Sequence, residues 1–212
     1  LYFFGMKFIL GLKKNMTQVF SENGVVSPVT VLEAGPVVVI QKKNKEKDGY
    51  NAIQVGFGNK NPKKLTKADI GHRKNLGSFR YLREFRLKNE SDLNKYNVGD
   101  KIDVSLFNEN DKVSVSSISK GKGFQGVVKR HGFGGGRRSH GQKHSEREPG
   151  SIAATGPQRV LKGTRMAGRM GSDVVTLKNI KVVQIDKENN LILIKGAVAG
   201  RRGTLVEMIS NS

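Results

Sequence analysis

The stretch of residues 121–126 has the residue types and spacing of a nucleotide-binding loop. Its glycines match G-x-G-x-x-G, and Glu146 follows the last glycine by 20 residues. The pattern binds a pyrophosphate only when a helix begins at its end and directs backbone amides toward the phosphates. Residues 127–132, Val-Val-Lys-Arg-His-Gly, predict no helix of useful length. We therefore reject dinucleotide binding and expect no cofactor and no small-molecule substrate.

Three of the four histidines, His131, His140 and His144, lie just beyond this stretch. Imidazole nitrogens can bind zinc, but a zinc site also needs a fixed set of further ligands. The chain contains no cysteine, and these histidines occur in a glycine-rich sequence without a fixed carboxylate pair. We expect no metal site here, and we expect histidines that face RNA or solvent.

Serines beside His140 and Glu146 could imitate a nucleophile and its base. Nucleophilic catalysis needs those groups held within hydrogen-bonding distance, which a mobile glycine-rich loop does not provide. No G-x-S-x-G turn is present either. Glu146 and Glu148 are better explained as ion-pair partners of Arg147, so we expect no catalytic residue and no enzyme.

The net charge of the chain is its most unusual property. The 212 residues include 38 Lys and Arg against 18 Asp and Glu, a formal net charge of +20. Residues 120–171 alone hold 12 Lys and Arg, 2 acidic residues and 13 of the 26 glycines. Such a concentration of positive charge favours a polyanionic partner. No run of 18 apolar residues exists, so we expect no transmembrane span. The sequence also lacks an amphipathic helix with an apolar face, so we expect no membrane partner.

Residues 120–171, here called the arm, contain few large apolar side chains. So few cannot offset the entropy of ordering 52 residues, and a segment of this kind inside a domain is functional or disordered. Strand-like sequence resumes after it, so the arm is an insertion and not a tail. We expect it to be partly mobile alone and ordered by RNA, whose phosphates attract cations and whose unpaired bases stack on rings. The predicted RNA-binding residues are Lys120, Lys122, Phe124, Lys129, Arg130, His131, Phe133, Arg137, Arg138, His140, Lys143, His144, Arg147, Arg159, Lys162, Arg165 and Arg169.

The flanks of the arm read as short strands bounded by turns. We exclude residues 1–5, because Met6 could be the start residue, and divide the rest into the first part of a barrel at 6–119, the arm at 120–171, and C-terminal strands at 172–212 that complete the barrel. An Asn-Gly pair at 23–24 predicts a hairpin, residues 63–74 predict a short helix with Thr66 as a possible cap, and residues 80–87 are ambiguous. Many short strands at this spacing predict a mainly β protein, a closed barrel or sandwich. The predicted strands are 6–12, 18–20, 25–26, 29–32, 37–41, 50–57, 102–107, 113–118, 174–177, 180–185, 191–198 and 204–209.

Several of these segments resemble a known family. Residues 119–130, Ser-Lys-Gly-Lys-Gly-Phe-Gln-Gly-Val-Val-Lys-Arg, are similar to the hallmark segment of the universal large-subunit ribosomal protein L-three family. Similar motifs recur in the family's order at 150–152, 160–163, 166–171 and 193–198. Residues 13–20 resemble the family's opening, with Asn15 where glycine is usual. The length is that of a bacterial or organellar member.

The resemblance implies a translation-factor-like β-barrel with a long extension inserted between its strands. It implies a structural role in the large subunit, with large-subunit rRNA and neighbouring ribosomal proteins as partners, a part in early assembly, and a place in the ribosome of the cytoplasm. The alternative is a free-standing RNA chaperone or assembly factor. By motif order, the arm tip near the peptidyl transferase centre would comprise Gly150, Ser151, Ile152, Ala153, Ala154, Thr155, Gly156, Pro157 and Gln158. Some bacterial members carry a methylated glutamine near the tip, but Gln158 does not align with it, so that modification is not carried over.

Overall fold

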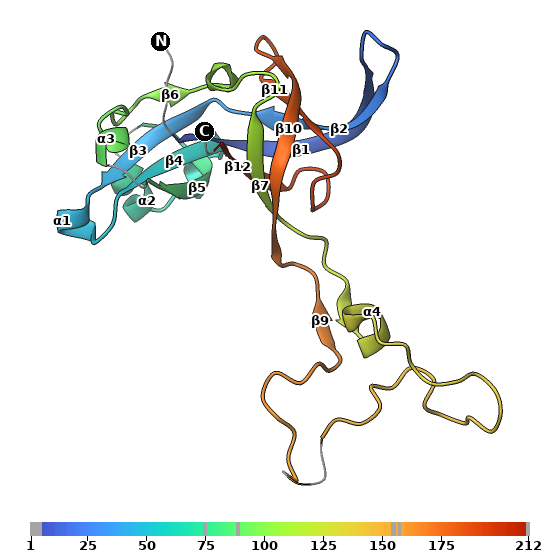
Figure 1. Ribbon diagram of the computed structural model, residues 1–212. Coiled ribbons are helices and arrows are strands. Elements are labelled where there is room, and N and C mark those ends of the chain that lie inside the picture. The colour runs from blue at the N-terminus through green and yellow to red at the C-terminus, as the bar shows by residue number, and fades with distance from the viewer. Residues whose placement is uncertain (1–5, 74–75, 88–89, 154–155, 157, 211–212) are drawn as a thin grey trace. The chain divides into compact units, whose positions relative to one another are not determined.

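The computed structural model describes residues 6–73, 76–87, 90–153, 156 and 158–210. The chain divides into two units (Figure 1). One combines the chain up to Ile118 with the chain from Val174 onward, and the other is the continuous segment Ser119–Asp173. Within the described residues, no helix has the length and apolar character needed to cross a membrane.

The first unit contains a closed barrel of antiparallel strands in the order β1-β12-β7-β10-β11-β2. The predicted mainly β fold with a closed barrel is confirmed. Three pairs of predicted strands are each one long strand: 6–12 with 18–20, 25–26 with 29–32, and 174–177 with 180–185. In the first and third, a register shift between Lys13 and Met16 and another between Leu177 and Ile180 bend the strand without ending it. The barrel strands are β1 Lys7–Phe20, β2 Val26–Ala34, β7 Lys112–Ile118, β10 Val174–Asp186, β11 Leu191–Lys195 and β12 Leu205–Ser210.

The predicted hairpin at residues 23–24 joins β1 to β2. Phe20 pairs with Val26 across it, and Gly24 has φ +74°, the left-handed conformation that favours glycine. Ser21 Oγ accepts a hydrogen bond from the amide of Val25 at 3.1 Å and helps to close the turn.

A second sheet of the same unit has the order β5-β4-β3-β6. Its strands are β3 Val37–Lys43, β4 Ala52–Asn59, β5 Phe79–Arg86 and β6 Lys101–Ile102. The ambiguous residues 80–87 thus form mainly a strand. The strand predicted over residues 102–107 is wrong beyond Ile102, since a 3-10 turn, η2 Val104–Leu106, follows. Val104 and Phe107 are both buried, and a spacing of three brings them to one face where strand alternation would separate them.

The helical elements of this unit are short. The helix predicted near residues 63–74 is present as η1 Pro62–Lys64 and α2 Lys67–Arg73. Thr66 caps α2 as predicted: its Oγ1 accepts from the amide of Asp69 at 3.2 Å, and Asp69 Oδ2 accepts from the amide of Thr66 at 3.4 Å. The single-turn helices α1 Lys45–Asp48 and α3 Glu90–Leu93 were not predicted, because one turn is too short to show helical periodicity.

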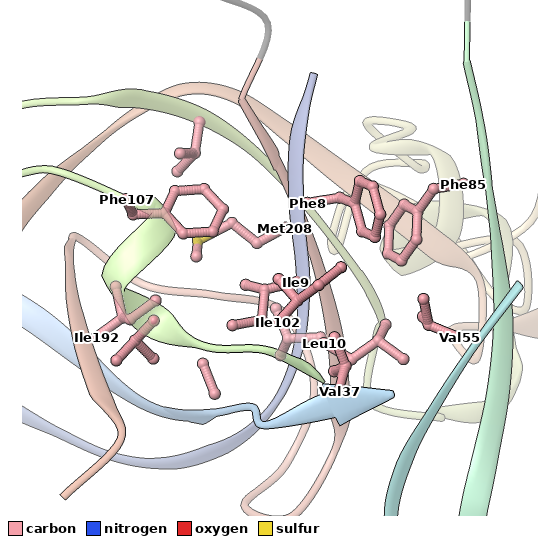
Figure 2. Close-up of a cluster of buried hydrophobic side chains, with 14 of the residues drawn as sticks. Phe8, Ile9, Leu10, Val37, Val55, Phe85, Ile102, Phe107, Ile192 and Met208 are labelled. Atoms are coloured by element: carbon pink, nitrogen blue, oxygen red, sulfur yellow. The ribbon is translucent and has the colours of Figure 1, made fainter. Parts of the chain in front are cut away.

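One apolar core links the barrel to the second sheet (Figure 2). Phe8 of β1 stacks on Phe85 of β5 with ring centroids 4.5 Å apart, and both side chains are buried. Burying a side chain of this size contributes about 1.5–3 kcal/mol. Phe107, Ile192 and Met208 extend the cluster on the barrel side. Every described member of the cluster belongs to this first unit, which therefore has its own hydrophobic core.

Candidate nucleic-acid interface

The segment Ser119–Asp173 begins and ends with two runs of chain that lie side by side. The amide of Ser119 donates to the carbonyl oxygen of Asp173 at 2.9 Å, and Ser119 Oγ accepts from the amide of Asp173 at 3.2 Å. Next, β8 Gly123–Gln125 pairs antiparallel with β9 Gly168–Met170. The two runs are thus held together by backbone hydrogen bonds, with little apolar burial.

A single-turn helix, α4 Val127–His131, follows β8. The Arg130 guanidinium donates from Nη1 to the carbonyl oxygen of Met166 at 2.7 Å, and His131 Nε2 lies 3.0 Å from the same oxygen. Both side chains are half-buried, and Val127 is buried. Two residues predicted to bind RNA therefore also hold the arm's own backbone together. The apolar pair Val127-Val128 between glycines was the sequence signal for this small packed element.

The G-x-G-x-x-G stretch has a different setting from a dinucleotide loop. The strand β7 precedes the pattern, but a second strand, β8, lies inside it, and the helix that follows has only five residues. Gly132 ends that helix with φ +74°. A helix this short offers little of the dipole and amide array that binds a pyrophosphate.

Between His131 and Gly168 the described residues form no further helix or strand. The chain folds back on itself where the amide of Gly136 donates to the carbonyl oxygen of Glu146 at 2.9 Å. Arg138 Nε lies 2.8 Å from Glu146 Oε1 and forms an ion pair. The expected pairing of Glu146 with Arg147 is thus corrected, because the fold-back brings Arg138 to this carboxylate. A side chain at Gly136 would meet the carbonyl oxygen of Ser145 at 2.7 Å, which explains part of the glycine content.

The predicted RNA-binding cations are solvent-facing. All of them except the half-buried Arg130 are exposed. Phe124 has 77% of its surface exposed, unusual for a phenylalanine ring, while Phe133 is half-buried with its ring centroid 6.0 Å from that of His131. His140 and His144 are exposed. No group of three potential metal-binding side chains occurs among the residues described. The surface of this segment therefore offers cations, the exposed phenyl ring of Phe124 and two exposed imidazole rings to a partner.

The predicted tip consists of exposed and mostly small residues where it is described. Gly150, Ser151, Ile152, Ala153, Gly156 and Gln158 are all exposed, and Ser151 Oγ donates to the carbonyl oxygen of Ala153 at 3.1 Å. Ala154, Thr155 and Pro157, which belong to the same prediction, lie outside the described residues.

Comparison with known proteins agrees with the motifs. The model of the family described as "Ribosomal protein L3" matches residues 91–190. The "Large ribosomal subunit protein uL3" of Herpetosiphon aurantiacus is 52% identical over 206 residues, which cover 96% of this chain and 95% of that protein. The chain belongs to the ribosomal protein L3 family. The resemblance seen in the sequence is confirmed.

Further members of the ribosomal protein L3 family are similar over nearly the same span. The proteins of Carboxydothermus hydrogenoformans and Bacillus thuringiensis (strain Al Hakam), both described as "Large ribosomal subunit protein uL3", are 51% and 49% identical. Each alignment covers 94% of this chain, and 95% and 94% of the respective relative. The family-model match includes the whole of Ser119–Asp173. The arm is therefore part of what defines this chain as an L3 protein.

Proposed function

We propose that this chain is a structural constituent of the large ribosomal subunit and binds large-subunit rRNA through the arm. Its near-full-length relatives are large-subunit proteins by name. The observation that carries the proposal is the exposed, largely unpaired cation set of the segment Ser119–Asp173. Among its described residues, Arg138–Glu146 is the one ion pair.

Counterion release supplies the affinity. Each cation that meets a phosphate displaces condensed counterions, and the gain depends steeply on salt. Arg can contact a phosphate bidentately or stack on a base, and Phe124 offers a ring to an unpaired base. The arm has little core of its own, so rRNA completes its folding and the bound arm in turn fixes the RNA around it.

The tip and the barrel have different tasks in this proposal. The small residues of the tip pass between rRNA segments near the peptidyl transferase centre and shape its surroundings. The barrel, with its own core, serves as the rigid platform and contacts neighbouring ribosomal proteins. Peptide bond formation remains RNA chemistry, and the chain contributes no catalytic group. The protein would support early subunit assembly and remain in the ribosome of the bacterial cytoplasm.

A salt titration tests the RNA-binding arm. Filter binding of the full chain to large-subunit rRNA is measured from low to moderate salt. If roughly eight arm cations meet phosphates, the arm contributes about −6 to −7 to the slope of log K against log salt. A slope near zero would exclude an electrostatic arm.

Sedimentation separates a ribosomal constituent from the alternative, a free-standing RNA chaperone or assembly factor. A constituent stays with large subunits at one copy per subunit through a moderate salt wash. A protein that is found only with immature particles, and is absent from finished subunits, would favour the alternative.

A further inference from the structure

A second cluster of positive charge lies in the barrel-containing unit, on the segment that holds η1 and α2. Residues 51–83 include eight Lys and Arg, and Asp69 is their single acidic residue. We propose that Lys60, Lys63, Lys64 and Lys67 form a second rRNA-binding surface, here called the lysine patch, that contacts phosphates and reads no bases. This inference rests on the proposed function and adds to it a site outside the arm.

The backbone that carries the lysine patch is fixed by capping hydrogen bonds. The amide of Lys60 donates to the carbonyl oxygen of Ser78 at 2.8 Å and joins the segment to the chain just before β5. Asn61 Oδ1 accepts from the amide of Lys63 at 3.0 Å and caps η1. The Thr66–Asp69 capping box then begins α2 at Lys67. The four lysines are thus presented by an ordered backbone, which lowers the entropic cost of binding.

The charges of the lysine patch are not balanced by the protein. Lys63, Lys64 and Lys67 are exposed, Lys60 is half-buried, and among the described residues none of the four forms an ion pair. Elsewhere in this unit, five carboxylates form ion pairs with other cations. Those pairs are Lys7–Asp111, Lys14–Glu33, Lys43–Glu84, Arg83–Glu207 and Lys95–Asp92.

The one carboxylate within residues 51–83 is also engaged. Asp69 is bound by the hydroxyl and amide of Thr66, and those hydrogen bonds, together with the charges of Arg73 and Lys60, lower its pKa. Arg73 adds a further cation: it is 4% exposed, and its Nε and Nη1 have no hydrogen-bond partner among the residues that the structure describes. Its Nη2 is 3.8 Å from Asp69 Oδ1. Residues 60–73 thus carry five cations and one carboxylate, and an external polyanion would neutralise the excess.

The residue types of the lysine patch favour contact with the phosphates of the RNA over contact with its bases. Lysine ammonium groups act as point charges toward phosphate, without the planar fork that reads guanine. Residues 60–73 contain no Phe, Tyr or Trp that could stack on a base. His72, the one other ring, lies with Nε2 2.5 Å from Gln54 Oε1. The patch would therefore add affinity that is nearly independent of RNA sequence.

Three full-length variants test the patch. The first changes the four patch lysines to Gln. The matched control changes Lys101, Lys112, Lys187 and Lys195 to Gln, which removes the same charge from exposed lysines on separate elements of the same unit. The third changes Arg137, Lys143, Arg147 and Arg159 of the arm to Gln. Circular dichroism and urea unfolding first confirm that each variant folds like the parent.

The salt dependence of rRNA binding is then compared. Loss of the patch should make the slope of log K against log salt shallower by about 3, because each lost phosphate contact contributes about 0.7–0.9. The scattered control should change the slope by less than about 1. Hydroxyl-radical footprints should show that the patch and arm variants expose different nucleotides.

The outcomes separate the two proposals. If the parent binds and the arm variant is impaired, while the patch variant matches the scattered control in slope and footprint, the lysine patch is refuted and the arm stands. If the parent shows no salt-dependent rRNA binding, the proposed function itself fails.

Discussion

Arg130 and Met166 join the two runs of the arm. The guanidinium Nη1 donates to the carbonyl oxygen of Met166 at 2.7 Å, and a Cβ at Gly168 would lie only 2.6 Å from the same nitrogen. The guanidinium therefore packs against backbone that a larger residue at 168 would displace. A side chain chosen from the sequence as an RNA ligand has a structural task in the free protein.

Replacing Arg130 by Ala should loosen the arm in the absence of RNA. A hydrogen bond from a charged donor contributes about 1.5–3 kcal/mol, and partial exposure reduces this to about 1 kcal/mol. The amide of Lys122, which donates to the carbonyl oxygen of Met170, should then exchange roughly fivefold faster. Arg137→Ala is the control, because that side chain is exposed. Equal exchange rates in the two variants would show that the contact does not order the arm.

Gly171→Ala should disrupt the base of the arm. Gly171 has φ +79°, and an added Cβ would come within 2.2 Å of the carbonyl oxygen of Lys120. The left-handed conformation alone costs an L residue about 1–2 kcal/mol, and the backbone clash adds to this. Gly163→Ala separates the cost of the left-handed conformation from the cost of the clash, since Gly163 has φ +86° and an added Cβ would have nothing within 4 Å. Hydrogen exchange at Lys122 should rise more in Gly171→Ala, and a similar rise in both variants would contradict the clash.

Acid should weaken the barrel unit partly through Glu84. Its carboxylate lies 2.8 Å from Lys43 Nζ and accepts from the Tyr50 hydroxyl at 2.8 Å, and the hydrogen bond from Lys43 chiefly lowers its pKa. A carboxylate whose pKa is lowered by folding stabilises the folded state at pH values above its usual pKa of about 4.3. This stabilisation is lost as the pH falls through the pKa that the carboxylate has in the folded state. Urea midpoints should therefore drop between about pH 5 and pH 3.

Glu84→Gln should make that drop shallower, because the amide does not titrate. Glu22→Gln, which removes an exposed carboxylate from the turn between β1 and β2, is the matched control. Identical profiles for the parent and Glu84→Gln would remove Glu84 from the acid response.

Ala153→Arg should affect the ribosome and not the barrel. The residue is exposed in the arm tip, outside the apolar core of the first unit. We expect slower peptide bond formation or altered binding of antibiotics at the peptidyl transferase centre, with a urea midpoint near that of the parent. Ser105→Arg, an exposed site in the barrel unit, is the matched control. Equal losses of barrel stability and translation in Ala153→Arg would contradict the division of tasks.

Much of the barrel could be predicted because its strands are encoded locally. In β7, apolar residues at every second position indicate a strand within seven residues. Between β1 and β2, the Asn-Gly pair alone indicates that the chain turns back on itself. The continuity of β10 through Ile180, and the 3-10 turn that buries Val104 and Phe107, could not be predicted. Both depend on partners distant in sequence, which decide whether a bulge or a turn is accommodated.

By itself the sequence determined the charge of the arm, its poverty in apolar residues and the family motifs, since composition and order need no coordinates. Only the tertiary structure decided which charges remain available. Arg138 is engaged by Glu146 and Arg130 by Met166, whereas the lysines at 60–67 keep no carboxylate within ion-pair distance among the described residues. The reason is physical: whether a cation is neutralised depends on distances of a few ångströms, and chain folding sets those distances between residues far apart in sequence.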